Sequence, residues 1–463
     1  MKEVKVAAFS IFFLLAIFST ISAQESVFWA NSPVGGLYDA GFIYRLDGNG
    51  QNLGIVHHFR GGTQGEQPFW DLTIGPNGRV YGIAFGGNNG RGVIFSISIL
   101  DGDYRVDYHF EMDGPSGSMV LASNGKLYGF VGSGFGHIFE FDPILGAFSI
   151  LHSFNRSEGR VVAINNLMIE VEENILLGVT TRGSSIPNED AGVIFTYDIE
   201  SSLYEVQYEF DGSAGFYPET IRPYLDGKFY GTTTGRGGTI FEFDYTTGEV
   251  SLVFSFPNHF SGLIPGILFA SDGNFYGVSG TGGEGHVGTI FRYHRSSGVF
   301  TTIKNFYEEN EPHIPETSLI QGQNGKIYGN TRYVSMANAG ITAFELDPTT
   351  DQLEFVTTNA SLGGLSIYNM LELGCEQLDP GNCEVLNIPL TSDGAFYPNP
   401  TRSGRVFYAP EPKVSNVQYF LFDLAGKMID QGMMQEAITI PGPKGVYLLS
   451  LPGLGICERV VKN

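Results

Sequence analysis

A short motif that recurs about every 50 residues constrains the fold of this chain more than any other feature. Each full copy contains Asn-Gly or Asp-Gly, then two residues, then Tyr-Gly, and the copies begin at positions 77, 124, 226, 272 and 324. A degenerate copy at 173–178 carries Leu177 in place of Tyr, and the first unit starts without a turn at Val27. Because Asn-Gly and Asp-Gly favour the type I′ turn, each copy predicts a two-stranded hairpin.

Two further motifs complete the repeating unit. A Gly-x-Ile-Phe type segment places an aromatic residue at 44, 95, 139, 195, 241, 291 and 344, so successive units lie 51, 44, 56, 46, 50 and 53 residues apart. A third segment ends the first six units with Phe at 59, 110, 154, 210, 256 and 306. Four short strands per unit and seven units predict a seven-bladed β-propeller. A parallel β-solenoid is the alternative, but its rungs are shorter and lack two hairpin turns per unit.

The two ends of the repeat region predict how the ring closes. The first unit lacks a leading strand, and residues 365–372, which follow the seventh unit, resemble the leading strands of other units. We expect this C-terminal strand to complete the first blade, which would remove a free sheet edge. The expected fold is therefore all-β, with four-stranded propeller blades over residues 24–373 and a small antiparallel β-sandwich over 396–463.

Composition agrees with this fold and excludes some partners. The 463 residues include 63 Gly, which suits many tight turns, and only 16% are charged. The net charge of −23 at pH 7 argues against nucleic acid as a partner, because a phosphate backbone needs a basic surface. Motifs for phosphate, calcium-loop or zinc binding are absent from the sequence, so we expect no cofactor and no metal. We expect a monomer.

Residues 1–23 predict a secretory signal peptide. Lys2 and Lys5 precede an apolar run at 6–18, and small residues follow it, so cleavage is expected after Ala23. The run is shorter than the roughly 20 residues that span a bilayer, although a retained membrane anchor is the alternative. No later stretch is apolar enough to span a membrane, so we expect no transmembrane segment.

Residues 374–395 predict a linker with a disulfide. Cys375 and Cys383 flank a Pro-Gly turn, and in an exported chain this arrangement favours a disulfide over two free thiols. Metal binding is disfavoured because no His or third Cys lies nearby. Cys457 then has no partner.

The repeat motifs resemble the tandem repeat called GloVer, which occurs in exported bacterial proteins. The resemblance covers residues 25–373, and the fourth unit departs from it most, with Leu177 and a longer loop at 179–191. It implies a propeller outside the cytoplasm and brings no assigned catalytic residues.

The C-terminal segment resembles the type A sorting domain of the type IX secretion system, because four separate motifs occur in the expected order. This resemblance implies a Bacteroidota-type cell, Sec export, and then transport across the outer membrane by the type IX machinery. The tail would typically be cleaved, and the product released or attached to the cell surface. An unrelated Ig-like binding module is the alternative. The residues that carry the match are Tyr397, Pro398, Asn399, Pro400, Asp423, Gly426, Lys427, Gly445, Tyr447 and Lys462.

The loops predict where a ligand would bind. In a propeller, the loops between the second and third strands and the loops between blades emerge on one face, and here these loops are Gly-rich and variable. In the loops between the second and third strands, the candidate binding residues are Arg182, Arg236, Glu284, His286 and Arg332. Glu284 and His286 come nearest to an acid/base pair, although the simpler interpretation is that both are solvated.

The aromatic residues and the pair His57-His58 favour a structural role. His57 and His58 occupy strand positions where other units carry Tyr, Ser or Glu, so we expect them in the blade and not on a metal. The repeated Tyr and Phe residues are expected to pack blade against blade, since they recur in every unit.

The sequence therefore predicts a secreted or cell-surface propeller that binds a glycan or a protein without catalysis. No Gly-x-Ser-x-Gly or His-Glu-x-x-His motif occurs, so no catalytic residue is assigned. One alternative is a polysaccharide lyase or glycoside hydrolase on the same scaffold, which a convergent pair of carboxylates or a His-Glu pair would favour. A structural surface protein is the other. The side chains that line the central channel would discriminate among them.

Overall fold

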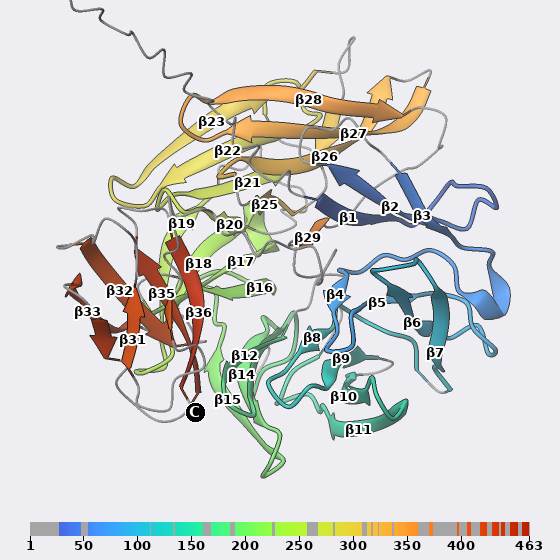
Figure 1. The fold of residues 1–463 in the computed structure, drawn as a ribbon, viewed down its shortest axis with the longest axis horizontal. Coiled ribbons are helices and arrows are strands. Elements are labelled where there is room, and N and C mark those ends of the chain that lie inside the picture. The colour runs from blue at the N-terminus through green and yellow to red at the C-terminus, as the bar shows by residue number, and fades with distance from the viewer. Residues whose placement is uncertain are drawn as a thin grey trace, which may run out of the picture.

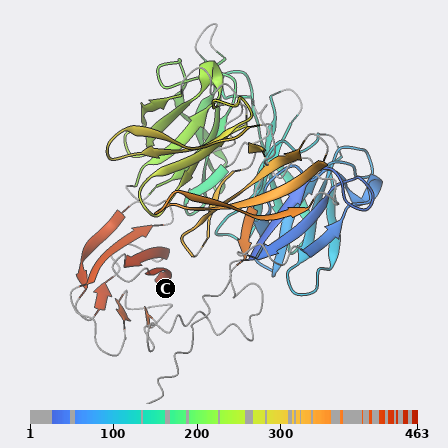
Figure 2. The same ribbon diagram turned by 90° about the horizontal axis from the view of Figure 1, so that it is seen from above.

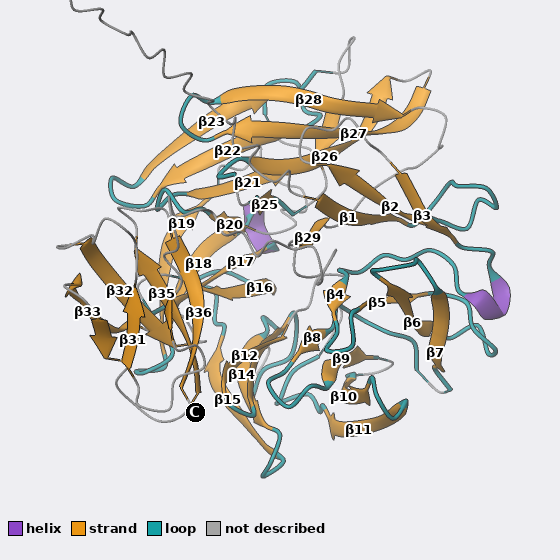
Figure 3. Cartoon of the chain, in the orientation of Figure 1, coloured by secondary structure: helices purple, strands orange, loops and turns teal. Residues whose placement is uncertain are grey.

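Seven sheets surround a central channel, which confirms the seven-bladed β-propeller (Figures 1 and 2). Strands and loops make up nearly the whole described chain, and helix occurs only as the single-turn 3-10 segments η1 (Gly62–Gln64) and η2 (Gly235–Gly237) (Figure 3). The computed structural model describes residues 27–47, 54–111, 113–132, 135–160, 168–185, 190–224, 227–256, 267–280, 283–307, 313–315, 318–322, 324–335, 338–359, 370–373, 396–397, 405–408, 417–423, 428–434, 437–439, 445–451 and 456–462.

Each blade runs from an innermost strand at the channel to an outermost strand at the rim. In this order the first three blades contain β29 (Met370–Leu373), β1 (Val27–Ser32), β2 (Phe42–Asp47) and β3 (Gly54–His58); β4 (Thr73–Ile74), β5 (Arg79–Ala84), β6 (Val93–Ser98) and β7 (Tyr104–His109); and β8 (Val120–Leu121), β9 (Leu127–Val131), β10 (His137–Asp142) and β11 (Ala147–Ser153).

The remaining four blades follow the same order. They contain β12 (Met168–Glu172), β13 (Ile175–Thr180), β14 (Val193–Asp198) and β15 (Leu203–Glu209); β16 (Pro218–Pro223), β17 (Phe229–Thr233), β18 (Thr239–Asp244) and β19 (Glu249–Ser255); β20 (Ile267–Phe269), β21 (Phe275–Ser279), β22 (Thr289–His294) and β23 (Val299–Asn305); and β24 (His313–Pro315) with β25 (Ile320–Gln321), then β26 (Ile327–Ser335), β27 (Asn338–Asp347) and β28 (Gln352–Asn359).

The ring closes as the sequence predicts. β29 pairs antiparallel with β1, and Met370 lies opposite Ala30, so a C-terminal strand completes the first blade. β29 spans Met370–Leu373, whereas residues 365–369 of the predicted strand lie outside the described residues. Every innermost strand therefore has one edge in the channel and one edge paired within its blade.

The seventh blade departs from the expected four strands. Both β24 and β25 pair with β26, which gives this sheet five strands. β26 and β27 also extend through the expected loop between the second and third strands that was to contain Arg332, because Tyr333 pairs with Ala339 and Ser335 with Asn338. The prediction of a loop around Arg332 is therefore wrong, and Arg332 lies within β26.

The Tyr-Gly and Gly-x-Ile-Phe motifs interlock in six of the seven blades. Gly129 lies opposite Phe139 in the sheet, and the Phe139 ring covers its Cα so closely that an added Cβ would come within 2.7 Å of the ring. Glycine leaves room for the ring, which explains why the two motifs occur together. The first blade is the exception, because Ala30 lies opposite Tyr44 there. Five other blades repeat the contact through the pairs Gly82–Phe95, Gly178–Phe195, Gly231–Phe241, Gly277–Phe291 and Gly329–Phe344.

The third motif is tied to the second by the backbone. The N–H of Phe110 donates to the carbonyl of Gly92 at 3.0 Å, and the same bond recurs in the next blade from Phe154 to Gly136. The outermost strand of each blade carries one extra residue where it pairs with the Ile-Phe step of the third strand or its equivalent. The register between these two strands therefore shifts there in all seven blades. Such a bulge increases the local twist that a blade needs.

Aromatic side chains pack neighbouring blades together, as the sequence predicts. The His57 ring stacks on Tyr104 of the second blade, with centroids 3.8 Å apart and planes 5° apart. His57 therefore has a structural role in the described blades. Three other outer-strand pairs stack in the same way, namely Tyr108–Phe148, His152–Tyr204 and Phe254–Phe300.

A Gly–Pro contact joins consecutive blades on the loop face, and the sequence reading missed it. Gly41 and Gly92 have positive φ, and an added Cβ on either would come within 2.7 Å of Cδ of a proline in the next blade, Pro68 or Pro115. In the same region the Glu66 N–H donates to the Phe85 carbonyl at 2.8 Å. This bond joins an interblade connection to a second-to-third-strand loop, so both loop types do emerge on one face.

The C-terminal segment forms two small antiparallel sheets. One contains β30 (Phe396–Tyr397), β31 (Arg405–Tyr408) and β34 (Ala437–Thr439), and the other contains β33 (Met428–Met434), β32 (Val417–Asp423), β35 (Gly445–Leu451) and β36 (Ile456–Lys462). Outside the described residues lie the signal peptide with Ala23, the linker with Cys375 and Cys383, and Pro398, Asn399, Pro400, Gly426 and Lys427. The described part of the chain contains no helix long and apolar enough to cross a membrane.

Candidate functional site

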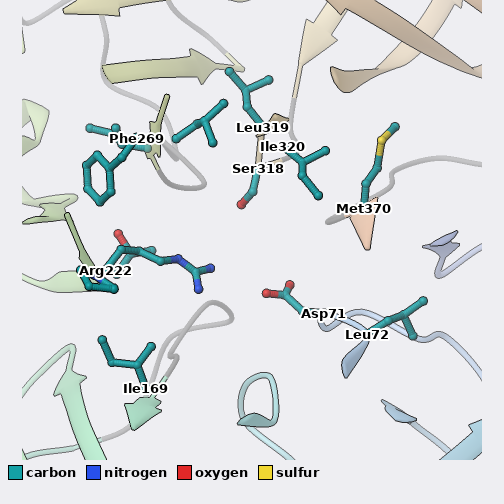
Figure 4. Close-up of a pocket in the computed structure, with 13 residues that line it drawn as sticks. Asp71, Leu72, Ile169, Arg222, Phe269, Ser318, Leu319, Ile320 and Met370 are labelled. Carbon is teal, nitrogen blue, oxygen red and sulfur yellow. The ribbon is translucent and has the colours of Figure 1, made fainter. Parts of the chain in front are cut away.

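A cavity of about 560 Å³ lies where the innermost strands converge on the central channel (Figure 4). Most of its lining is apolar, and the volume falls in the range of small-molecule binding pockets. The apolar lining comes from six different innermost segments around the ring, with Leu72, Ile169, Phe269, Leu319, Ile320 and Met370 among its residues.

Strand register shows that one charged residue interrupts this apolar ring. Each blade places one innermost-strand residue opposite the motif aromatic or its equivalent, and Arg222 lies opposite Tyr230. At the same position the other blades carry Thr73, Val120, Ile169, Leu268, Ile320 and Leu371. Arg222 is therefore the only charged side chain at this level of the ring.

The Arg222 guanidinium points across the cavity toward the Asp71 carboxylate (Figure 4). Within the described residues it makes no hydrogen bond and no ion pair closer than 4.0 Å. Burial lowers the pKa of the Arg222 guanidinium, and the negative charge of Asp71 opposes this shift. The positive charge thus remains available to a group inside the cavity.

The Asp71 carboxyl is held in place by the third blade. Its backbone N–H donates to Ser118 Oγ at 3.0 Å, and two residues further on Thr73 Oγ1 donates to the Met119 carbonyl at 2.7 Å. Burial raises the pKa of the Asp71 carboxyl above its ordinary value, while the charge of Arg222 and a hydrogen bond with Ser118 oppose this. Asp71 and Arg222 are both half-buried, and the charge of each opposes the effect of burial on the other.

This arrangement suits binding better than acid/base chemistry. Hydrolysis of glycosides generally uses two carboxyl groups, and Asp71 is the only carboxylate among the described residues that line the cavity. The described residues also contain no cluster of three or more His, Cys, Asp and Glu side chains that could hold a metal. Two opposite charges in an apolar space can orient a ligand that carries complementary charges.

The structure brings two of the predicted loop-face residues together. Arg182 lies over the Tyr217 ring at 4.6 Å and pairs with Asp190 at 3.0 Å. Arg236, on the next blade, lies over the adjacent Phe216 ring at 4.2 Å. The two guanidinium groups therefore flank consecutive aromatic residues on the loop face.

The other predicted loop residues do not join this group. Glu284 and His286 are both exposed, and neither makes a hydrogen bond to the other in the described chain. The Glu284 carboxylate instead accepts a hydrogen bond from the Tyr307 hydroxyl at 3.2 Å. The candidate acid/base pair of Glu284 and His286 therefore gains no support. The side chain of Arg332 lies outside the described residues.

Asp71 and Arg222 were not predicted as site residues, because the sequence placed the candidate binding residues on the loops. Arg222 gave no clear signal in the sequence, because its strand, Pro218–Pro223, also contains the polar residues Glu219 and Thr220. Asp71 gave none either, because it stands just before the leading strand of its blade.

Solved structures with similar folds have low sequence identity. The Bacteroides fragilis protein described as a "putative 6-phosphogluconolactonase" has 14% identity and a TM-score of 0.50, over 77% of this chain and 99% of its own. A protein of the same description from Bacteroides uniformis has 11% identity and a TM-score of 0.48, over 76% of this chain and 100% of its own. TolB from Acinetobacter baumannii has 12% identity and a TM-score of 0.42, over 74% of this chain and 66% of TolB, just under two thirds. At such identities, the likeness to the Bacteroides fragilis protein shows the fold alone.

The sequence itself assigns the family. No curated protein matches the chain. A family described as the Gloeobacter/Verrucomicrobia repeat matches residues 16–188 and again 176–367, which together cover most of the propeller. The chain therefore belongs to the Gloeobacter/Verrucomicrobia repeat family.

Proposed function

We propose that this chain is an exported binding protein that holds an organic ligand in its central channel through Arg222 and Asp71, without catalysis. The observation that carries the proposal is the guanidinium of Arg222, which has no hydrogen-bond partner among the described residues and lies in a mainly apolar cavity. Even partial burial of a charge without a paired partner costs stability, so such groups are concentrated at functional sites, and Arg222 is half-buried. A purely structural blade needs no charge at this position, as six of the seven blades demonstrate.

The sequence supports a location outside the cytoplasm. Residues 1–23 have the pattern of a signal peptide, and residues 396–463 resemble a type IX sorting domain. On this proposal the protein passes through Sec and the type IX machinery, and is then released or displayed on the outer-membrane surface. A ligand would reach the channel from the extracellular side.

The cavity limits the size of the ligand. A volume of about 560 Å³ accepts a small molecule, or the end of a glycan or peptide, but not a folded protein. The loop-face residues Arg182 and Arg236, with their two aromatic partners, offer a surface for the rest of a longer ligand.

Calorimetric titration of the full chain tests this proposal. The panel contains neutral and acidic oligosaccharides, short peptides, amino acids and organic acids, and the variant is Arg222→Met. Arg105→Met is the matched control, because Arg105 is exposed on β7 and pairs with Asp103. We expect a ligand that binds the wild type and the control but not Arg222→Met. Equal binding to all three proteins, or release of products from a polysaccharide, would contradict the proposal.

A further inference from the structure

We infer that the channel selects small zwitterions, whose carboxylate pairs with Arg222 and whose ammonium group pairs with Asp71 on either side of an apolar body. This inference rests on the proposed function, because it names the ligand class for the same cavity. It concerns the side chains that line the channel and does not involve the loop face.

The first step concerns the anionic end of the ligand. A guanidinium presents a planar fork of donors that matches a carboxylate with two parallel hydrogen bonds. Arg222 has all its donors free within the described residues and points into the cavity. A carboxylate on the ligand would therefore find a partner that no side chain of the described protein occupies.

The second step concerns charge balance. If a simple anion paired with Arg222, the Asp71 carboxylate would lose its nearest compensating charge while remaining in an apolar surrounding. Leaving one charge buried and uncompensated is strongly unfavourable. An ammonium group on the same ligand restores balance, because the two positive and two negative charges then alternate across the cavity.

The third step concerns the distance between the charges. Asp71 and Arg222 belong to the second and fifth blades and face each other without forming an ion pair (Figure 4). A ligand placed between them must present its two charges at opposite ends. This geometry favours ω-amino carboxylates over α-amino acids, whose charges sit on one carbon.

The fourth step concerns the body of the ligand. Leucine, isoleucine, phenylalanine and methionine side chains surround the space between the two charges, with Phe269, Leu319 and Met370 among them. A methylene chain or an alicyclic ring loses little on entering such a space, whereas the several hydroxyls of a sugar would find only Thr220 and Ser318 as neutral polar side chains in the described lining. The lining therefore disfavours an unmodified sugar as the ligand.

Calorimetric titration of the full chain with a series of probes tests the inference. The probes are ω-amino carboxylates from aminobutanoate to aminooctanoate, with hexanoate, hexylamine and hexanol as analogues that keep one charge or none. We expect one zwitterion to bind about tenfold or more tightly than either single-charge analogue of similar length. Arg222→Met should then prefer hexylamine, and Asp71→Asn should prefer hexanoate, while Arg105→Met keeps the wild-type order.

The selectivity change separates a binding role from a structural role, since a merely destabilised channel would weaken all probes together. If Arg222→Met fails to fold, the isosteric Asp71→Asn still decides the matter by its preference for hexanoate. Equal binding of hexanoate and the zwitterions by the wild type would overturn the inference. If no zwitterion binds, but an oligosaccharide binds the wild type and not Arg222→Met, the zwitterion is wrong and the channel site stands.

Discussion

In the third blade Gly129 lies directly opposite Phe139, and the phenyl ring occupies the space that a Cβ on Gly129 would need. Five other blades have the equivalent contact, so the repeated Tyr-Gly and Ile-Phe motifs form one packing unit. The family repeat thus follows from steric fit inside a blade, while the residues that line the channel differ from blade to blade.

Gly129→Ala should destabilise the propeller by about 1–3 kcal/mol, the usual cost of overpacking a buried site. The added methyl group would press on the Phe139 ring, which is fully buried. Urea unfolding followed by fluorescence measures the change. Gly54→Ala is the control, because its methyl group would meet only the flexible Arg45 side chain. Equal losses in the two variants would show that the ring contact is unimportant.

A Tyr–Glu–Lys network in the third blade should be energetically coupled. The Tyr128 hydroxyl donates to Glu140 Oε2 at 2.7 Å, and Lys126 Nζ donates to Glu140 Oε1 at 2.7 Å. A double-mutant cycle of Tyr128→Phe and Glu140→Gln should give a coupling energy of about 0.5–1.5 kcal/mol. Glu205→Gln, on the exposed rim, is the control and should couple to neither change. A coupling energy near zero would refute the network.

His57 should make stability depend on pH. Burial, assisted by the positive charges of His58 and Arg60, lowers the pKa of His57 from 6.5 to about 4. Between these values the unfolded chain binds a proton that the folded chain does not, so stability falls as pH falls from 6.5 towards 4. Above pH 6.5 the imidazole is neutral in both states and this contribution is complete.

His57→Phe should therefore flatten the stability profile in this window, while the ring keeps its stacking on Tyr104. Phe254 at the equivalent position of the fifth blade stacks on Phe300 in the same way. Thermal unfolding at several pH values across the window measures how steeply stability depends on pH. His286→Gln is the control, because His286 is exposed. An unchanged slope in His57→Phe would contradict the assignment of the pH dependence to this residue.

Deleting residues 396–463 should hold the propeller in the periplasm, because that segment contains the motifs that resemble a type IX sorting domain. Cell fractionation and surface labelling measure the location. Cys457→Ser is the control, since Cys457 is outside the matched motifs and its loss should leave export intact. Continued surface display after the deletion would refute the sorting role.

Local turn chemistry and repetition explain why the fold could be predicted from sequence. An Asn-Gly or Asp-Gly pair marks its hairpin without reference to the rest of the chain, and seven units leave few ways to pack. The expected type I′ geometry is wrong, because only the Gly of each described pair has positive φ, as at Gly125 and Gly273. The predicted closure depended on a missing strand at one end and an extra strand at the other. The longer β26 and β27 were not predicted, because pairing through Tyr333 and Ala339 has no turn signal of this kind.

The candidate site could not be predicted in the same way. Asp71 and Arg222 belong to the second and fifth blades and lie far apart in the sequence, and only the closed ring brings them to one cavity. Their significance depends on what the other blades place at the same level, which becomes visible after the strand registers are aligned. Loop residues such as Glu284 drew attention because they are polar, although polar residues are ordinary on an exposed loop.

The effect of ligand on the thermal unfolding midpoint of the wild type and of Arg222→Met tests the central claim most directly. A ligand at about a hundred times its Kd should stabilise the wild type by about 2.7 kcal/mol, and so raise the midpoint. We predict this rise in the wild type and in Arg105→Met, and none in Arg222→Met. The same rise in Arg222→Met would contradict a binding site in the central channel.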